Sequence, residues 1–164
     1  MAKYTMELPT EIMQDIRKIE DNADGIFGSM TKAAAEACAA NVRANAPNKE
    51  LANAVKVSRT YKTPSDDGIN NKVYFSGYLP FSGSRKTFAR RGKARGKIYE
   101  DSKGIPMDFL AKVTEYGTSP RYTDYGLYRG YIGKKPFFRK GFRPDQIEQI
   151  MRDVQKRESG GLLE

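Results

Sequence analysis

Glu115-Tyr116-Gly117-Thr118-Ser119-Pro120 is the stretch that organises this chain of 164 residues, and Pro136-Phe137-Phe138 follows it sixteen residues after Pro120. Gly117 suits a positive φ, so it is expected to end the periodic segment from Met107 to Glu115. In that segment Phe109, Leu110 and Val113 are expected to face the core. Thr118 and Ser119 offer hydroxyls that cap the turn. The stretch therefore predicts a short helix closed by a tight turn.

Two roles are open for Glu115. Its carboxylate either accepts hydrogen bonds from backbone N–H groups of the same turn or reaches a basic residue of an adjacent subunit. Pro136 sets the approach of the chain to the last helix. Phe137 and Phe138 supply two apolar anchors, worth roughly 1.5 to 3 kcal/mol each when fully buried. We expect both phenylalanines to pack in the core.

The C-terminal segment predicts the best defined helix. Pro144 fits its first turn and Asp145 complements the helix dipole. Its apolar stripe consists of Ile147, Ile150, Met151 and Val154. Two surface ion pairs are expected at a spacing of four residues, Glu148 with Arg152 and Asp153 with Arg157. Gly160-Gly161 ends the helix.

The N-terminal region predicts two helices. The first begins after Pro9 with Thr10 as its cap and ends between Asp21 and Gly25. One of its faces carries Ile12, Ile16 and Ile19. The second helix carries a stripe whose spacing alternates between four and three, namely Ile26, Met30, Ala33, Ala37, Ala40 and Ala44. Such a stripe packs on the domain's own sheet or on a neighbouring subunit. Pro47 ends the helix because it has no N–H to donate.

The middle of the chain predicts strands. Alternation from Val55 to Lys62 indicates a half-buried strand, interrupted on its apolar face by Arg59. Turn formers fill residues 63–68, and β-branched and aromatic residues from Lys72 to Tyr78 indicate a second strand, so a β-hairpin is the simplest pairing. Helices at both ends with a small antiparallel sheet between them predict an α+β fold, as one domain over residues 1–164.

Four tyrosines recur at every third residue between the two motifs: Tyr122, Tyr125, Tyr128 and Tyr131. A tyrosine combines an apolar ring with a polar tip and is favoured at protein interfaces. We therefore expect a subunit contact here, with packing on the domain's own surface as the alternative.

Positive charge is concentrated in a loop or arm at about 80–104. Between Gly83 and Gly104 the chain has eight basic residues against two acidic ones, which is most of its net charge of +9. The residues expected to contact DNA or a partner are Arg85, Lys86, Arg90, Arg91, Lys93, Arg95 and Lys97. We expect the segment to become ordered only when an anionic partner or a neighbouring subunit binds it. Clustered charge attracts phosphates without reading bases. Contact with DNA or with acidic subunits therefore stands beside the simpler interpretation of a solvated charged loop.

The composition argues against an enzyme. Histidine is absent, which removes the commonest general base near neutral pH and the commonest metal ligand. The mid-chain carboxylates Asp66, Asp67 and Asp124 lie in turn-like contexts. The run from Gly92 to Lys97 lacks the spacing and the following Ser or Thr of a phosphate-binding loop. We expect no catalytic residue, no metal site and no cofactor.

The single cysteine and the apolar pattern bear on the compartment. Cys38 lies in an alanine-rich run and is expected to be a small buried side chain, and no disulfide framework is possible within one chain. The N-terminus lacks the apolar core of a signal peptide, and no run of about 18 apolar residues occurs. Export and membrane spanning are not expected.

The order of these features resembles the tail-completion, or neck, proteins of long-tailed bacteriophages. In that family a Glu-aromatic-Gly-Thr turn, here Glu115 to Thr118, precedes a Pro-Phe-aromatic segment, here Pro136 to Phe138, before the last helix. The alanine-rich helix, the Asn45-Ala46-Pro47 break and a strand that begins through Leu51-Ala52-Asn53-Ala54-Val55 stand in the same order. Family members carry a small residue and glycine where this chain reads Asn48-Lys49-Glu50, and the basic segment 83–104 resembles an enlarged insertion.

The resemblance implies a non-enzymatic virion protein, made in the host cytoplasm. Its copies would form a ring, a hexamer, at the joint between head and tail. The ring would contact the neck or connector and a tail-terminator or tail-tube protein, with DNA passing through its lumen without sequence readout. The alternative from another class is a small basic protein that binds DNA independently of sequence.

Overall fold

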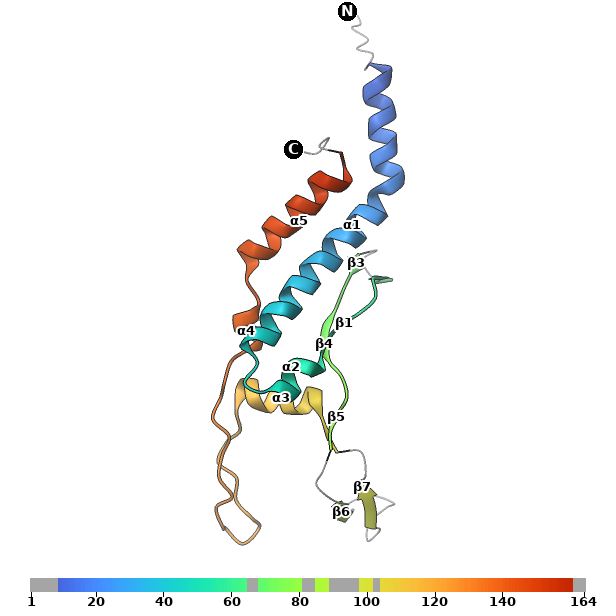
Figure 1. Cartoon of the computed structure of the whole chain (residues 1–164). Helices are drawn as coiled ribbons and strands as arrows, with labels where there is room; N and C mark the ends of the chain where they lie inside the picture. Colours follow the sequence, from blue (N-terminus) through green and yellow to red (C-terminus); the bar gives the residue numbers. More distant parts are fainter. Residues whose placement is uncertain (1–8, 65–67, 81–84, 89–97, 102–103, 161–164) are drawn as a thin grey trace, which may run out of the picture. The chain divides into compact units, whose positions relative to one another are not determined.

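The structure of the chain is a computed structural model that describes residues 9–64, 68–80, 85–88, 98–101 and 104–160 (Figure 1). The fold is α+β, as predicted, with a long N-terminal helix, antiparallel pairs of short strands and a C-terminal helix. The chain divides into two compact units. Unit 1 comprises Met1–Ala37, Ser58–Lys72 and Arg143–Glu164, and unit 2 comprises Cys38–Val57 and Val73–Phe142.

The N-terminal helix α1 (Thr10–Asn45) runs without a break over 36 residues. The predicted break between Asp21 and Gly25 is therefore wrong. No proline lies inside this stretch, and a glycine inside a helix costs only about 1 kcal/mol relative to alanine, which a long helix tolerates. Pro47 does stop the helix, as predicted, because α1 ends two residues before it.

The buried face of α1 departs from the predicted stripe in its second half. Ile26 and Met30 are buried, but Ala40 and Ala44 are exposed. A spacing of four and three averages 3.5 residues per turn, so on a straight helix the stripe rotates by about 20° per heptad. In this second half of α1 the buried residues are instead Ala34, Ala35, Cys38, Ala39 and Val42. Burial raises the pKa of the Cys38 thiol, which stays protonated and unreactive, as its predicted packing role requires.

In unit 1 the C-terminal helix α5 (Pro144–Glu158) packs against α1 through a small apolar cluster (Figure 1). Its buried members are Ile26, Met30 and Val154, with Ala33 and Met151 partly buried against them. Glu148 and Arg152 form the predicted ion pair at 2.6 Å, whereas Arg157 binds Glu158 at 3.1 Å in place of Asp153. Exposed pairs of this kind contribute little, so the apolar cluster positions α5.

The other part of unit 1 is the antiparallel pair β2 (Tyr61–Lys62) and β3 (Ile69–Asn70). Asn71 ties this pair to α1. Its side-chain oxygen accepts a hydrogen bond from the Thr31 hydroxyl at 2.9 Å, and its amide group donates to the Ser58 carbonyl at 3.1 Å.

Unit 2 is built on the end of α1 and on five further elements. These are α2 (Lys49–Ala54), β1 (Val55–Val57), β4 (Val73–Phe75), α3 (Met107–Tyr116) and α4 (Phe138–Gly141). β1 pairs antiparallel with β4, in a register that places Val55 opposite Phe75. The core of unit 2 includes Val42, Leu51, Val55, Met107, Ala111 and Phe137.

Helix α2 corrects the expectation that Leu51 to Val55 leads directly into a strand. Asn48 has an extended backbone, and its side-chain oxygen accepts a hydrogen bond from the Leu51 N–H at 2.9 Å. Asparagine is among the strongest N-cap residues, so it starts a helix at this position. The strand begins only at Val55.

The predicted hairpin is confirmed in its antiparallel pairing, β1 with β4 and β2 with β3, but its strands are shorter than predicted. The first strand is interrupted at residues 58–60, around Arg59, where a charged residue breaks the apolar alternation.

Two further antiparallel pairs lie at the ends of the basic segment and within it. β5 (Tyr78–Leu79) pairs with β8 (Ile105–Pro106), and β6 (Arg85–Phe88) pairs with β7 (Ile98–Asp101). In the second pair, the register sets Arg85 opposite Asp101 and Lys86 opposite Glu100.

The close approach of α4 to α1 can be tested at Gly141. A Cβ at this position would lie 2.6 Å from Val42 Cγ2 and 2.8 Å from Val42 N. We expect Gly141→Ala to lower the free energy of unfolding by about 1–3 kcal/mol, the usual cost of overpacking, in urea denaturation. Gly133→Ala is the control, because a Cβ there has nothing within 4 Å. Equal losses in the two variants would contradict this packing.

Candidate functional site

The Glu115 carboxylate joins the two sequence motifs. It lies near the end of α3 and is only 6% exposed. Its Oε2 accepts hydrogen bonds from the backbone N–H groups of Phe137 at 2.7 Å and Phe138 at 2.9 Å, and its Oε1 accepts one from Arg139 at 3.3 Å. These donors lie at the start of α4, whose own N-cap residue makes no side-chain hydrogen bond. Glu115 therefore caps a helix that begins 23 residues after it.

Two roles were open for Glu115, and in the structure its carboxylate binds backbone N–H groups. Those groups belong to residues 137–139, however, and not to its own turn. The turn closes without it, since the Gly117 N–H donates to the Val113 carbonyl at 2.8 Å. One sequence signal was available: Glu115 stands at the end of a stripe with a spacing of four whose other members, Met107 and Ala111, are apolar and buried.

The energetics favour this capping arrangement. A hydrogen bond to a charged group contributes about 1.5–3 kcal/mol, and a buried carboxylate without donors would be strongly destabilising. The Arg139 guanidinium adds less. Its Nε lies 3.9 Å from Oε1 and the group stands over the Tyr116 ring at 5.3 Å, but the side chain is 72% exposed. The backbone donors therefore carry most of the stabilisation.

The buried face of α3 corrects one prediction. Phe109 was expected to face the core, but it is 58% exposed. Residue 109 lies about 200° around the helix axis from Ala111, so burying Ala111 turns Phe109 outward. Leu110 and Val113, also predicted to face the core, are half-buried beside the stripe.

Gly117 has the predicted positive φ, at 75°. It also meets a close neighbour, because a Cβ on it would lie 2.7 Å from the Ile132 carbonyl oxygen. Thr118 continues this contact: its N–H donates to the Ile132 carbonyl, and its hydroxyl accepts from the Ile132 N–H, both at 2.9 Å. The Thr118 hydroxyl therefore binds the returning chain and not the turn that was predicted. Ser119 is exposed.

The Pro136-Phe137-Phe138 segment packs as predicted. Phe137 is 2% exposed, and its ring meets that of Phe75 edge to face at 5.8 Å. Phe138 is half-buried, with its ring 6.1 Å from the same Phe75 ring. The two anchors hold α4 against β4, so the donors that Glu115 binds are fixed in place.

Residues 118–132 form a β-hairpin-like excursion between the two motifs, here named the tyrosine arm (orange after α3 in Figure 1). The Arg121 N–H donates to the Gly130 carbonyl at 3.0 Å, and the Thr123 N–H donates to the Leu127 carbonyl at 2.8 Å. Tyr122 and Tyr128 face each other across the hairpin with ring centroids 5.5 Å apart.

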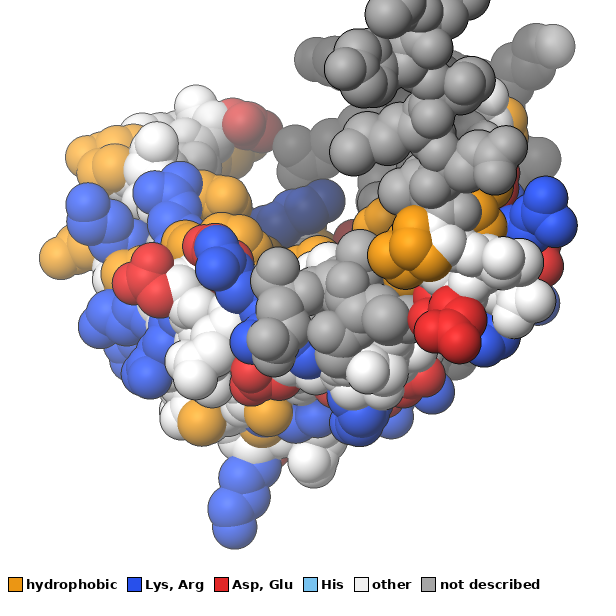
Figure 2. Space-filling view, turned by 90° about the horizontal axis from the view of Figure 1, so that it is seen from above, with side chains coloured by type: hydrophobic (Ala, Val, Ile, Leu, Met, Phe, Trp, Pro, Cys, Tyr) orange, Lys and Arg blue, Asp and Glu red, His pale blue; other side chains and the backbone are white. Residues whose placement is uncertain are grey.

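The four predicted interface tyrosines all lie on this arm and are all exposed. The exposed fractions are 62% for Tyr122, 93% for Tyr125, 57% for Tyr128 and 64% for Tyr131. Beyond the Tyr122–Tyr128 ring contact, most of this aromatic surface is open to solvent. Figure 2 shows the molecule from above, and on that face too some hydrophobic side chains are exposed between charged ones. A subunit contact through these tyrosines stays a prediction.

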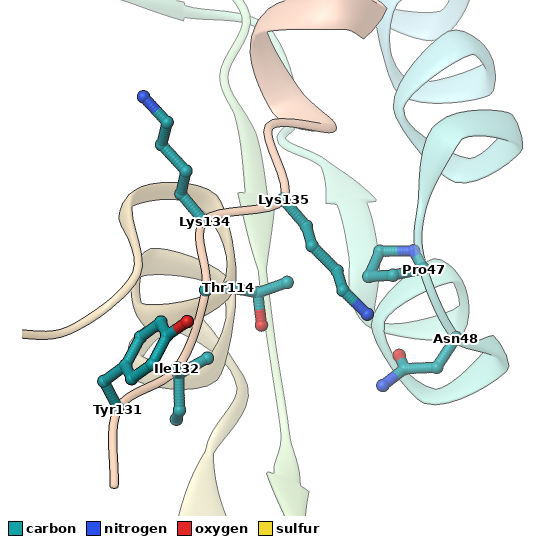
Figure 3. Close-up of a pocket in the computed structure, with 8 residues that line it drawn as sticks. Pro47, Asn48, Thr114, Tyr131, Ile132, Lys134 and Lys135 are labelled. Atoms are coloured by element: carbon teal, nitrogen blue, oxygen red, sulfur yellow. The ribbon is translucent and has the colours of Figure 1, made fainter.

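A hollow of about 470 Å³ opens at the base of the arm (Figure 3). Its walls are formed by Pro47, Asn48, Thr114, Tyr131, Ile132, Gly133, Lys134 and Lys135. Lys135 extends across it towards Pro47 and Asn48, whereas Lys134 points away. None of these lining residues is a carboxylate, a thiol or an imidazole, the side chains that most often bind metal ions.

Several predicted site residues lie outside the described part of the chain. These are Arg90, Arg91, Lys93, Arg95 and Lys97 of the basic segment, the whole run Gly92 to Lys97, and Asp66 with Asp67. Arg85 and Lys86 belong to β6. Asp124 lies in the turn at the tip of the tyrosine arm.

Among the residues that the structure describes, no group of three or more His, Cys, Asp or Glu side chains is placed to hold a metal ion. No helix in these ranges has the length and apolar character needed to cross a membrane.

Comparison with protein-family models, with curated proteins and with solved structures finds no match to this chain.

The capping role of Glu115 can be tested by substitution. We expect Glu115→Ala to lower the free energy of unfolding by about 2–4 kcal/mol, because it removes charged acceptors from buried N–H groups. Urea denaturation followed by circular dichroism measures the change. The control is Glu148→Ala, which removes an exposed carboxylate and should cost about 0.5 kcal/mol or less. Similar costs for the two variants would show that the buried cap contributes nothing special.

Gly117 and Gly126 form a matched pair for the close approach. Both have positive φ, 75° and 77°, but a Cβ at Gly126 has nothing within 4 Å. We expect Gly126→Ala to cost only the backbone strain of about 1–2 kcal/mol. Gly117→Ala should cost clearly more, because its φ of 75° is combined with a ψ of −173°, which disfavours any residue but glycine, and because the Ile132 carbonyl must also move. Thermal unfolding of both variants measures this difference, and equal midpoints would argue against the contact.

Proposed function

We propose that this chain is a structural protein of a tailed-bacteriophage virion, a tail-completion or neck subunit whose copies form a ring, a hexamer, at the head–tail junction. Support comes from the Glu115 carboxylate and its bonds to the N–H groups of Phe137 and Phe138. The two motifs on which the family resemblance rests are thereby one physical unit.

The joined motifs also favour a role in assembly. They hold both ends of the tyrosine arm at one place in unit 2 and leave its aromatic side chains exposed. Exposed clustered aromatic residues are typical of surfaces that bind other proteins. In a ring each copy meets two neighbours, and its outer faces contact the connector and the tail-terminator or tail-tube protein. In this proposal the protein has a structural role and catalyses no reaction.

The proposed lumen of the ring accommodates DNA without reading its sequence. The chain has a net charge of +9, and the segment 89–97 contains basic residues but no acidic residue. Phosphate attraction of this kind weakens as salt rises, which suits DNA that must pass through without being held.

The same charge favours a second candidate function, a small basic protein that binds DNA independently of sequence. Eight basic residues against two acidic ones between Gly83 and Gly104 carry this alternative. The two functions differ in assembly. The DNA-binding protein would act as a monomer or dimer with high affinity, whereas the ring subunit needs contacts between many copies.

Virion composition decides between the two functions. We expect mass spectrometry of purified phage particles to find the protein in a fixed copy number that fits a hexamer, and particles made without it to accumulate as separate heads and tails. Negative-stain microscopy of the concentrated protein should show rings, and its DNA affinity should fall steeply between about 50 and 200 mM salt. Infectious particles that lack the protein, or a monomer with high DNA affinity at the upper salt concentration, would refute the proposal.

A further inference from the structure

On the basis of this proposed function, we propose that the tyrosine arm of one copy docks on the N-terminal half of α1 in the next copy, so that the chain assembles head to tail. Two exposed apolar surfaces of opposite charge carry this proposal, one in each unit.

The first surface is the part of α1 that extends beyond its contact with α5. Ile12 is 46% exposed and Ile16 is 49% exposed, and the stripe continues through the half-exposed Ile19 and Ala23. The same spacing of four and three then reaches Ile26, which is buried in the cluster with Val154 of α5. One continuous stripe is thus covered at one end by a helix of the same chain and open at the other. A spacing of this kind is the pattern by which helices pack against partners.

The charge beside the open stripe selects the kind of partner. Residues 10–24 contain five acidic and two basic residues. Asp15 and Glu20 flank the stripe, one on each side, at about 70° around the axis from its centre. Two copies of this helix in parallel would set Asp15 opposite Glu20, which is repulsive. The favoured partner is therefore an apolar surface that carries positive charge.

The second surface, on the tyrosine arm, has this character. Its most exposed apolar residues are Tyr122, Tyr125, Leu127, Tyr128 and Tyr131. Residues 118–132 contain two basic residues, Arg121 and Arg129, and one acidic residue, Asp124. Arg121 and Arg129 are joined to each other by a backbone hydrogen bond of 2.6 Å, and both side chains are exposed. They can pair with Glu20 and with Asp15, which within one chain binds Lys18 at 3.0 Å, while the tyrosine rings cover the isoleucines.

The two surfaces differ, so their contact is heterologous. Each copy then contacts one neighbour through its tyrosine arm and the other neighbour through its α1, and repeating this contact generates a ring if the rotation closes. A two-fold dimer that joined like surfaces would oppose Arg121 and Arg129 to their own copies, so the arm-on-helix contact is the one that matches both apolar area and charge. Two reciprocal contacts of this kind would close at a dimer, which sedimentation of the unchanged chain distinguishes from a longer head-to-tail assembly.

Complementation between two defective variants tests this directly. The arm variant carries Tyr125→Ser and Tyr128→Ser, and the helix variant carries Ile12→Ser and Ile16→Ser. All four side chains are exposed, so both variants should keep the fold, which circular dichroism checks. In sedimentation velocity we expect each variant alone to be a monomer, with self-association at least about tenfold weaker than that of the unchanged chain. Mixed, they should form a one-to-one heterodimer, because one intact contact remains.

Charge reversal provides a second, independent test. Asp15→Lys with Glu20→Lys, or Arg121→Glu with Arg129→Glu, should each weaken self-association by at least about tenfold. All four changes in one chain should restore it. Failure of restoration would show that these charges do not face each other.

Other outcomes overturn the contact. Continued self-association of the arm variant would indicate a helix–helix contact, and that of the helix variant would indicate an arm–arm contact. An unchanged chain that is still monomeric at about 1 mM would also overturn it. The proposed function is judged separately. A protein found in virions whose variants do not complement refutes only this contact, whereas complementing variants of a protein absent from virions refute the proposed function.

Discussion

A buried carboxylate that accepts hydrogen bonds from the first backbone N–H groups of α4 is the constraint on which unit 2 depends. The donors at the start of a helix have no partner within it, and a buried charge is tolerated only where donors surround it. The Glu115 carboxylate gives these N–H groups of residues 137–139 an acceptor, and they give the buried carboxylate its donors. The chain between them must therefore leave and return at nearly the same point. Gly117 allows this, because a side chain there would collide with the Ile132 carbonyl.

The tyrosine arm follows from that closure. A two-stranded hairpin has no second layer against which to bury its side chains, and by itself it is marginally stable in water. The arm's base is fixed by the Thr118–Ile132 hydrogen bonds and by the bond from the Lys135 N–H to the Thr114 carbonyl. Its aromatic residues stay exposed. In the assembly that we propose, this exposed apolar surface meets the open half of α1 in another copy.

Comparison of sequence and structure separates two kinds of inference. Pro47, Gly117 and Pro144 were placed correctly because each acts through its own backbone, by a missing donor or an allowed φ. The break in α1 was wrong because turn-forming residues at 21–25 are weak signals that neighbouring helical turns override. Phe109 was wrong because its outward direction depends on which face α3 buries, and the neighbouring elements decide that.

The site shows the same division. Sequence by itself determined the α+β class, the ends of α1 and α5, the burial of Cys38 and the two phenylalanine anchors, because composition, periodicity and backbone chemistry act over a few residues. Only the tertiary structure decided that Glu115 caps α4, that Asn71 ties strands to α1, and that the arm tyrosines face solvent. These outcomes join positions more than twenty residues apart or depend on which surfaces are covered. Local preference carries no information about either.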